Sequence, residues 1–215
     1  MDLKKITFLL IVSFIASFFM RTIGTIFPII FQNVYVVKAA IAVHTFFIGV
    51  QLLFYGYFLR EYAAHRQQIL RAGSVLAIMG SCFVAFIYIK TFCLVFEIDI
   101  IPLSLINHHF DAILPLTSSL LFMLFFGIFK KVQSQEEHRM LDRPTTSAII
   151  GIGIFIVLHV IVLVHFMVFH KFDWLEYMSR NVALGTTPFL VVAALFILYF
   201  YIKFYTFLCL YGNKY

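Results

Sequence analysis

Long apolar stretches alternate with short polar breaks along the chain. A helix needs about 20 mostly apolar residues to cross the roughly 30 Å hydrocarbon core of a bilayer. The pattern predicts membrane-spanning helices near residues 6–29, 36–59, 72–95, 111–129, 146–170 and 183–211. We therefore expect an all-α membrane protein, a six-transmembrane-helix bundle with short loops and no soluble domain. Residues 1–215 would then form a single transmembrane domain.

The composition agrees with this interpretation. Of the 215 residues, 63% are hydrophobic and 12% are charged, and the mean hydropathy is +1.00. Soluble domains average about 45–50% apolar and about 25% charged residues, and a soluble fold of this size could not hide so much apolar surface. The lipid bilayer is therefore the expected partner. The net charge of +6 does not require a nucleic-acid partner, because basic residues also orient membrane proteins.

The basic residues divide unevenly between the two sets of connections. With the amino terminus inside, the inner segments hold ten of them: Lys4, Lys5, Arg60, Arg66, Arg71, Lys130, Lys131, Arg139, Arg143 and Lys214. The outer connections hold only Lys171 and Arg180. The positive-inside rule then predicts that both termini are cytoplasmic. The initial lysines and the basic inner loops favour a bacterial inner membrane. An organelle membrane stays an alternative.

Histidines are concentrated toward the outer half of the predicted bundle. His44 lies eight residues into the second span, about 12 Å deep at about 1.5 Å per residue. His159 lies close to the middle of the fifth span, and His165 lies nearer its outer end. Arg21 falls in the outer half of the first span. Polar groups at such depth usually face the bundle interior or a water-filled cavity.

Two kinds of cofactor site fit these residues. In the first, His44 faces His159 or His165 across the bundle and both ligate a b-type haem, while Arg21 neutralises a propionate. In the second, imidazoles and carboxylates bind a transition metal at the outer face. The residues for that metal site are His108, His109, His165 and His170 with Glu97, Asp99 or Asp111. The plainer alternatives are packing or interfacial histidines, and an Arg21 side chain that reaches the outer headgroups.

The third span carries a small residue at every fourth position. Gly73, Ala77, Ser81 and Ala85 share one helix face. Such a face lets a neighbouring helix approach closely. We expect it to serve packing within the chain rather than a dimer interface.

No recognisable catalytic motif occurs, so we do not expect an enzyme. Three functions remain. The favoured one is a non-catalytic subunit of a larger, redox-linked membrane complex, with other membrane subunits or a second copy as partners. The first alternative is a small-solute or ion transporter or channel, with a polar path along Arg21, Gln51, His159 and residues 117–119. The second is a membrane ligand sensor that signals through a separate partner docked on residues 130–143.

Overall fold

The computed structural model describes residues 2–27, 33–98, 108–134, 139–169 and 180–211 of the 215-residue chain. The described residues contain six helices that are long and apolar enough to cross a membrane. They are α1 (Leu3–Ile26), α2 (Val34–Tyr57), α3 (Gln68–Val95), α4 (His108–Ser134), α5 (Asp142–Phe169) and α7 (Arg180–Tyr211). The predicted six-span, all-helical architecture of an integral multi-pass membrane protein is therefore confirmed.

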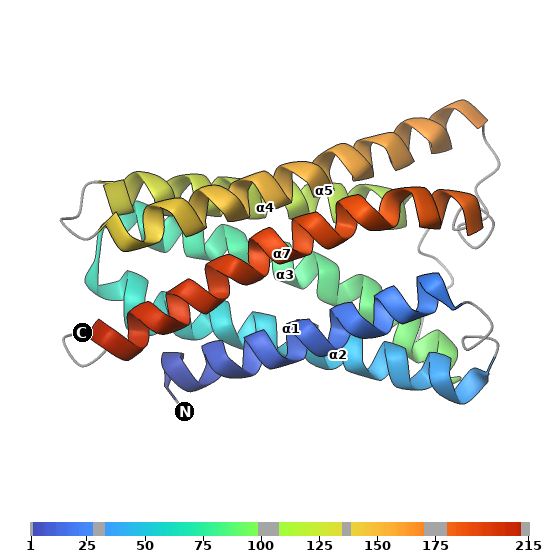
Figure 1. The fold of residues 1–215 in the computed structure, drawn as a ribbon, viewed down its shortest axis with the longest axis horizontal. Helices are drawn as coiled ribbons and strands as arrows, with labels where there is room; N and C mark the ends of the chain where they lie inside the picture. The colour runs from blue at the N-terminus through green and yellow to red at the C-terminus, as the bar shows by residue number, and fades with distance from the viewer. Residues whose placement is uncertain (1, 28–32, 99–107, 135–138, 170–179, 212–215) are drawn as a thin grey trace.

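The six helices form a closed ring in chain order. Each helix packs against the next one in the sequence, and α7 packs against α1. Helix α1 begins and α7 ends at the same end of the bundle, which we call the terminal end; the opposite end is the loop end (Figure 1). In a ring of six, the second and fifth members stand opposite each other. Helices α2 and α5 therefore face each other across the bundle.

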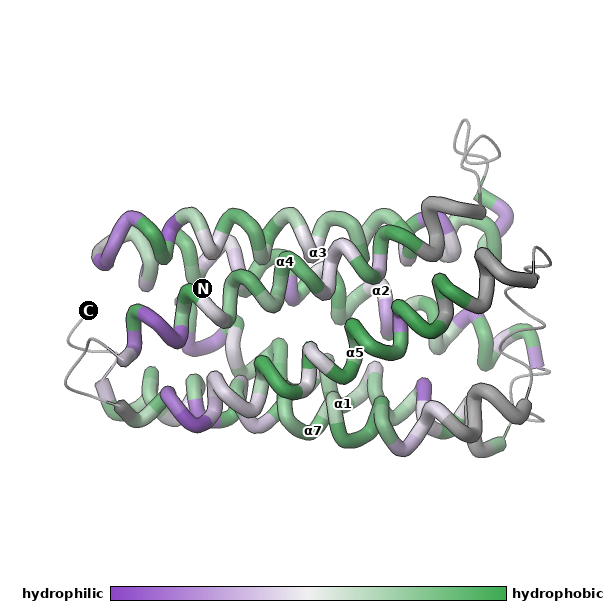
Figure 2. The backbone as a smooth tube through the Cα atoms, turned by 90° about the horizontal axis from the view of Figure 1, so that it is seen from above, coloured by the Kyte–Doolittle hydropathy of each residue, from purple (hydrophilic) through white to green (hydrophobic). Residues whose placement is uncertain are grey.

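Several helices continue past the predicted spans. Helix α3 begins at Gln68 instead of residue 72, and α5 begins at Asp142 instead of residue 146. The predicted break at residues 60–71 is partly helical, because a π-helical turn (Phe58–Tyr62) and a 3₁₀ turn (Ala63–His65) extend α2. Hydropathy marks the part of a helix that lies in hydrocarbon, whereas its polar ends continue into the headgroup region. Figure 2 shows hydrophilic positions mostly near the ends of the bundle.

The amino-terminal ends of α1 and α2 are set by side-chain caps. Asp2 accepts a hydrogen bond from the Lys5 backbone N–H at 2.8 Å, and Asn33 accepts one from the Tyr35 N–H at 2.9 Å. Each cap satisfies a backbone donor that the helix leaves without a partner. The Leu3 N–H donates to the Glu61 carboxylate at 2.8 Å, which ties the start of α1 to the end of α2.

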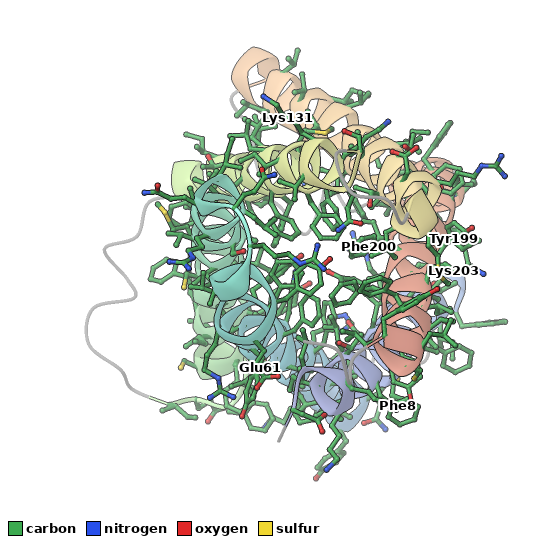
Figure 3. The ribbon with its side chains drawn as sticks, turned by 90° about the vertical axis from the view of Figure 1, so that its left-hand side faces the viewer. Phe8, Glu61, Lys131, Tyr199, Phe200 and Lys203 are labelled. Atoms are coloured by element: carbon green, nitrogen blue, oxygen red, sulfur yellow. The ribbon has the colours of Figure 1, made fainter. Side chains whose placement is uncertain are left out.

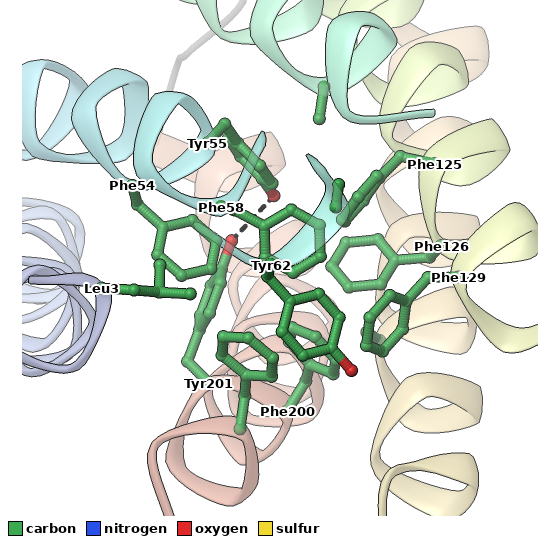
Figure 4. Close-up of a cluster of buried hydrophobic side chains, with 14 of the residues drawn as sticks. Leu3, Phe54, Tyr55, Phe58, Tyr62, Phe125, Phe126, Phe129, Phe200 and Tyr201 are labelled. Carbon is green, nitrogen blue, oxygen red and sulfur yellow. Dashed lines mark hydrogen bonds between the residues drawn. The ribbon is translucent and has the colours of Figure 1, made fainter. Parts of the chain in front are cut away.

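Aromatic side chains fill the middle and the terminal half of the ring, and we call them the aromatic core (Figure 4). They are Phe54, Tyr55, Phe58, Tyr62, Phe125, Phe126, Phe129, Phe200, Tyr201, Phe204 and Phe207, each at most 3% exposed. Many ring pairs meet edge to face, as Phe54 and Tyr201 do at 5.5 Å and 86°, a favourable arrangement for aromatic quadrupoles. The hydroxyls of Tyr55 and Tyr201 share a 3.1 Å hydrogen bond inside this core.

The small-residue face of α3 packs against α4. Gly73, Ala77, Ser81 and Ala85 are all buried. The Ser118 hydroxyl of α4 donates to the Gly80 carbonyl at 2.9 Å, which requires that the two helices lie very close together. The expectation of packing within the chain is confirmed.

Candidate functional site

Two histidines from opposite helices lie at similar depth. His44 is ten residues from the start of α2 at Val34, because 44 − 34 = 10. His159 is ten residues from the end of α5 at Phe169, because 169 − 159 = 10. At about 1.5 Å per residue, each lies about 15 Å from the loop-end terminus of its helix. Both side chains are half-buried, as expected for polar groups turned away from lipid.

Neighbouring helices hold His44 on two sides. Its Nδ1 atom lies 2.9 Å from the Ser17 hydroxyl of α1. Its ring meets the Tyr88 ring of α3 edge to face, with the centroids 5.6 Å apart. These contacts fix the plane of the imidazole.

His159 has a similar partner. Its Nδ1 atom lies 3.3 Å from the Ser119 hydroxyl of α4. The Ser119 hydroxyl also donates to the Pro115 carbonyl at 2.9 Å. A hydroxyl that donates to Pro115 has an oxygen that can accept from His159 Nδ1–H. In the neutral imidazole, Nε2 then carries a lone pair that is able to bind a metal.

Arg21 is an exposed cation of α1 in the same half of the bundle as the two histidines. Arg21 lies one helical turn beyond Ser17 toward the loop end. Four helices of the ring, α1, α2, α4 and α5, contribute to one group of polar residues: Ser17, Arg21, His44, Ser119 and His159. We call this group the histidine site.

The aromatic core borders the histidine site toward the middle of the bundle. Gln51, nearly two turns beyond His44 along α2, hydrogen-bonds to Tyr55, whose hydroxyl bonds to Tyr201. Polar side chains therefore extend from the loop-end half to the middle of the bundle, where the aromatic core begins. The site can offer imidazole nitrogens and one cation to a bound group.

Most of the other candidate ligands from the sequence have side chains that the structure does not describe. His108, His109 and Asp111 lie in α4 and His165 lies in α5, but their side chains fall outside the described part of the structure. His170 lies outside the described residues altogether. The outer-face metal site and the pairing of His44 with His165 stay predictions. Among the side chains that are described, no group of three or more His, Cys, Asp or Glu could hold a metal ion.

The polar path along residues 117–119 stays a prediction. Thr117 donates to the Ile113 carbonyl of its own helix, and Ser118 donates to Gly80 of α3. Of the three residues, Ser119 is the one that reaches a histidine. Sequence reasoning also missed Ser17, although its position one turn from Arg21 was a usable signal. Tyr88 gave no such signal, because its contact depends on how α2 and α3 pack.

Comparisons with protein-family models, with curated proteins and with solved structures found no match to this chain.

Proposed function

We propose that the chain is a non-catalytic membrane subunit of a redox complex and that it holds a b-type haem between His44 and His159. One observation carries this proposal. By residue count the two histidines lie at similar depth on opposite helices of the ring, and each has a serine hydroxyl from an adjacent helix at Nδ1. Helical bundles build cofactor sites from facing side chains of this kind.

Haem fits the available ligands better than a bare metal ion does. A porphyrin supplies four nitrogen ligands, so the protein needs to supply only the two axial ones. A structural zinc site needs four protein ligands and a catalytic one needs three. The proposed site offers two imidazoles and an arginine, and an arginine does not ligate metals.

The serine contacts match the usual surroundings of a metal-binding histidine. Such a histidine normally donates its second ring N–H to a nearby oxygen, which fixes the tautomer and the orientation of the ring. His159 meets this requirement through Ser119. His44 and Ser17 have the same pair of atoms at 2.9 Å, so Nδ1–H donation would expose Nε2 there as well.

Arg21 suits the acidic edge of a haem. Guanidinium groups pair strongly with carboxylates, often through two parallel hydrogen bonds. Arg21 would then hold a propionate of the bound haem. This assignment gives a role to a charge whose place in a membrane span is otherwise costly.

The transporter alternative has less support. A conducting path would have to cross the aromatic core, in which Phe54, Phe58 and Phe129 are at most 1% exposed. Of the three hydroxyl residues expected along the path, Thr117 donates to a carbonyl of its own helix and Ser118 donates to a carbonyl of α3. Nothing in the described residues favours the sensor alternative.

The haem content of the purified full chain tests the proposal. The chain is expressed where haem is available and purified in detergent, and haem per chain is measured by the pyridine haemochrome assay. We expect one haem for the natural chain and loss of it in His44→Ala and in His159→Ala. A natural chain without haem, or full haem content in both variants, would overturn the proposal.

A matched control is His65→Ala. His65 ends the 3₁₀ turn at the terminal end, so the same chemical change is made far from the histidine site. We expect the haem content of this variant to equal that of the natural chain. Size-exclusion profiles of all three variants separate loss of the ligand from loss of the fold.

A further inference from the structure

A groove at the terminal end lies between α7 and the start of α5. It has a volume of about 500 Å³ and is lined by Met140, Asp142, Arg143, Pro144, Tyr199 and Lys203. The 3₁₀ turn Arg139–Leu141 and the first residues of α5 form one wall, and α7 forms the other. This groove lies at the opposite end of the bundle from the histidine site.

The groove faces outward from the ring. Figure 3 shows Tyr199 and Lys203 on the outer side of α7, whereas Phe200 points into the bundle. Along α7, Tyr199 continues an exposed apolar stripe that includes Val192, Leu195 and Ile202. In a membrane this stripe contacts lipid chains. The groove therefore opens onto the surface where the acyl region meets the headgroups.

Two cations of the lining come from different elements. Arg143 belongs to the first turn of α5 and is exposed, and Lys203 lies on α7 with its ammonium 5.8 Å from the centre of the Tyr199 ring. Asp142 contributes one negative charge, so the lining carries a net charge of +1. Lys203 lies eight residues before the end of α7 at Tyr211, about 12 Å along the helix. A lysine at that depth on a lipid-facing surface is costly unless its ammonium reaches headgroups.

We propose that this groove binds the phosphate headgroup of an anionic phospholipid, with Arg143 and Lys203 on the phosphate and the acyl chains along the apolar stripe of α7. Basic pockets between membrane helices near the headgroup level bind such lipids. The apolar stripe beside the groove favours a lipid over free phosphate, because an inorganic ion would leave that surface unused. The proposal is independent of haem binding at the other end.

Native mass spectrometry of the full chain in detergent tests this site with two probes, phosphatidylglycerol and phosphatidylcholine of identical acyl chains. We expect the natural chain to retain one phosphatidylglycerol in preference to phosphatidylcholine. Near a membrane surface each basic residue is worth about a fivefold change in affinity, so Arg143→Gln with Lys203→Gln should weaken phosphatidylglycerol binding by about 30-fold. Lys131→Gln removes the same charge from an exposed residue of α4 outside the groove and should leave binding unchanged.

Two further measurements separate loss of the site from poor folding and lipid binding from phosphate binding. The charge-preserving pair Arg143→Lys with Lys203→Arg should retain most of the binding, even if the neutral pair folds poorly. Inorganic phosphate added alone should not displace the lipid. The proposal is overturned if the natural chain binds both lipids equally, if Lys131→Gln weakens binding as much as the groove variant does, or if inorganic phosphate displaces the lipid.

Discussion

Each central histidine has a serine of the adjacent ring helix at its Nδ1 atom. Ser17 of α1 serves His44 of α2, and Ser119 of α4 serves His159 of α5. A hydroxyl has one hydrogen to donate, so its other bonds decide the tautomer of the imidazole. At Ser119 the donation to Pro115 favours the His159 tautomer that carries its proton on Nδ1. The uncharged serines thus influence which imidazole nitrogen is available to bind a metal.

Ser119→Ala tests this dependence. Loss of the acceptor for His159 Nδ1–H should weaken haem binding by about 10–100-fold, as is typical when such an outer partner of a metal ligand is removed. Haem titration of the purified variant measures the change. Ser74→Ala removes a hydroxyl that likewise donates to a carbonyl one turn earlier in its helix, at Leu70, and should leave haem affinity unchanged. Equal affinities in both variants would contradict the assigned tautomer.

The hydrogen bond between Tyr55 and Tyr201 leads to a second prediction for single residues. Both hydroxyls are buried, and removal of either one breaks the hydrogen bond that they share. Tyr55→Phe or Tyr201→Phe alone should lower the free energy of unfolding by about 1 kcal/mol. The double variant should lower the free energy of unfolding by less than the sum of the two single effects. Thermal unfolding in detergent measures all three, and strict additivity would argue against the bond.

At the scale of helices, close approach depends on glycines whose neighbours leave no room for a side chain. A Cβ on Gly151 of α5 would lie 2.7 Å from the Ala193 carbonyl oxygen of α7 and 3.2 Å from Ile197. The backbone atom cannot move aside as a flexible side chain can. Helices α5 and α7 are therefore held together at a point where only glycine fits.

Gly151→Ala should push α5 and α7 apart and lower the free energy of unfolding by about 1–3 kcal/mol, the usual cost of overpacking. Gly49→Ala in α2 is the matched control, because no atom lies within 4 Å of its added Cβ. Replacement of a helical glycine in open space is expected to be neutral or stabilising by up to about 1 kcal/mol. Similar unfolding midpoints for the two variants would show that the α5–α7 contact is looser than described.

For the whole molecule, the six spans could be predicted because a bilayer demands a minimum apolar length. The helix ends could not, since polar residues such as Gln68 and Asp142 continue helices beyond the hydrocarbon. The depth of His44 and His159 was also predictable from residue counting. Their contacts with Ser17 and Ser119 were not, because these depend on how neighbouring helices pack around the ring, which periodicity does not encode.

The aromatic core shows a second limit of sequence reasoning. The chain has 28 phenylalanines, and they occur both inside the ring and on its outer surface. Phe54 is 1% exposed, whereas Phe8 is 54% exposed. Because lipid and protein interior are equally apolar, hydrophobicity cannot tell these two environments apart.

The side of the membrane on which the termini lie is a prediction at the same scale. In a background without the three natural cysteines, Asn33→Cys marks the loop end and Gln67→Cys marks the terminal end; both positions are exposed. The distribution of basic residues predicts that a membrane-impermeant maleimide labels Asn33→Cys in intact cells and Gln67→Cys only after lysis. The reverse pattern would place the termini outside.

The electron paramagnetic resonance spectrum of the oxidised, purified chain tests the central claim most directly. Two imidazoles on one ferric haem give a low-spin signal, and loss of either ligand converts the iron to a high-spin form or releases the haem. We expect a low-spin signal in the natural chain that disappears in both His44→Ala and His159→Ala and persists in His65→Ala. Absence of a haem signal from the natural chain, or a low-spin signal that survives both substitutions, would contradict a haem held between α2 and α5.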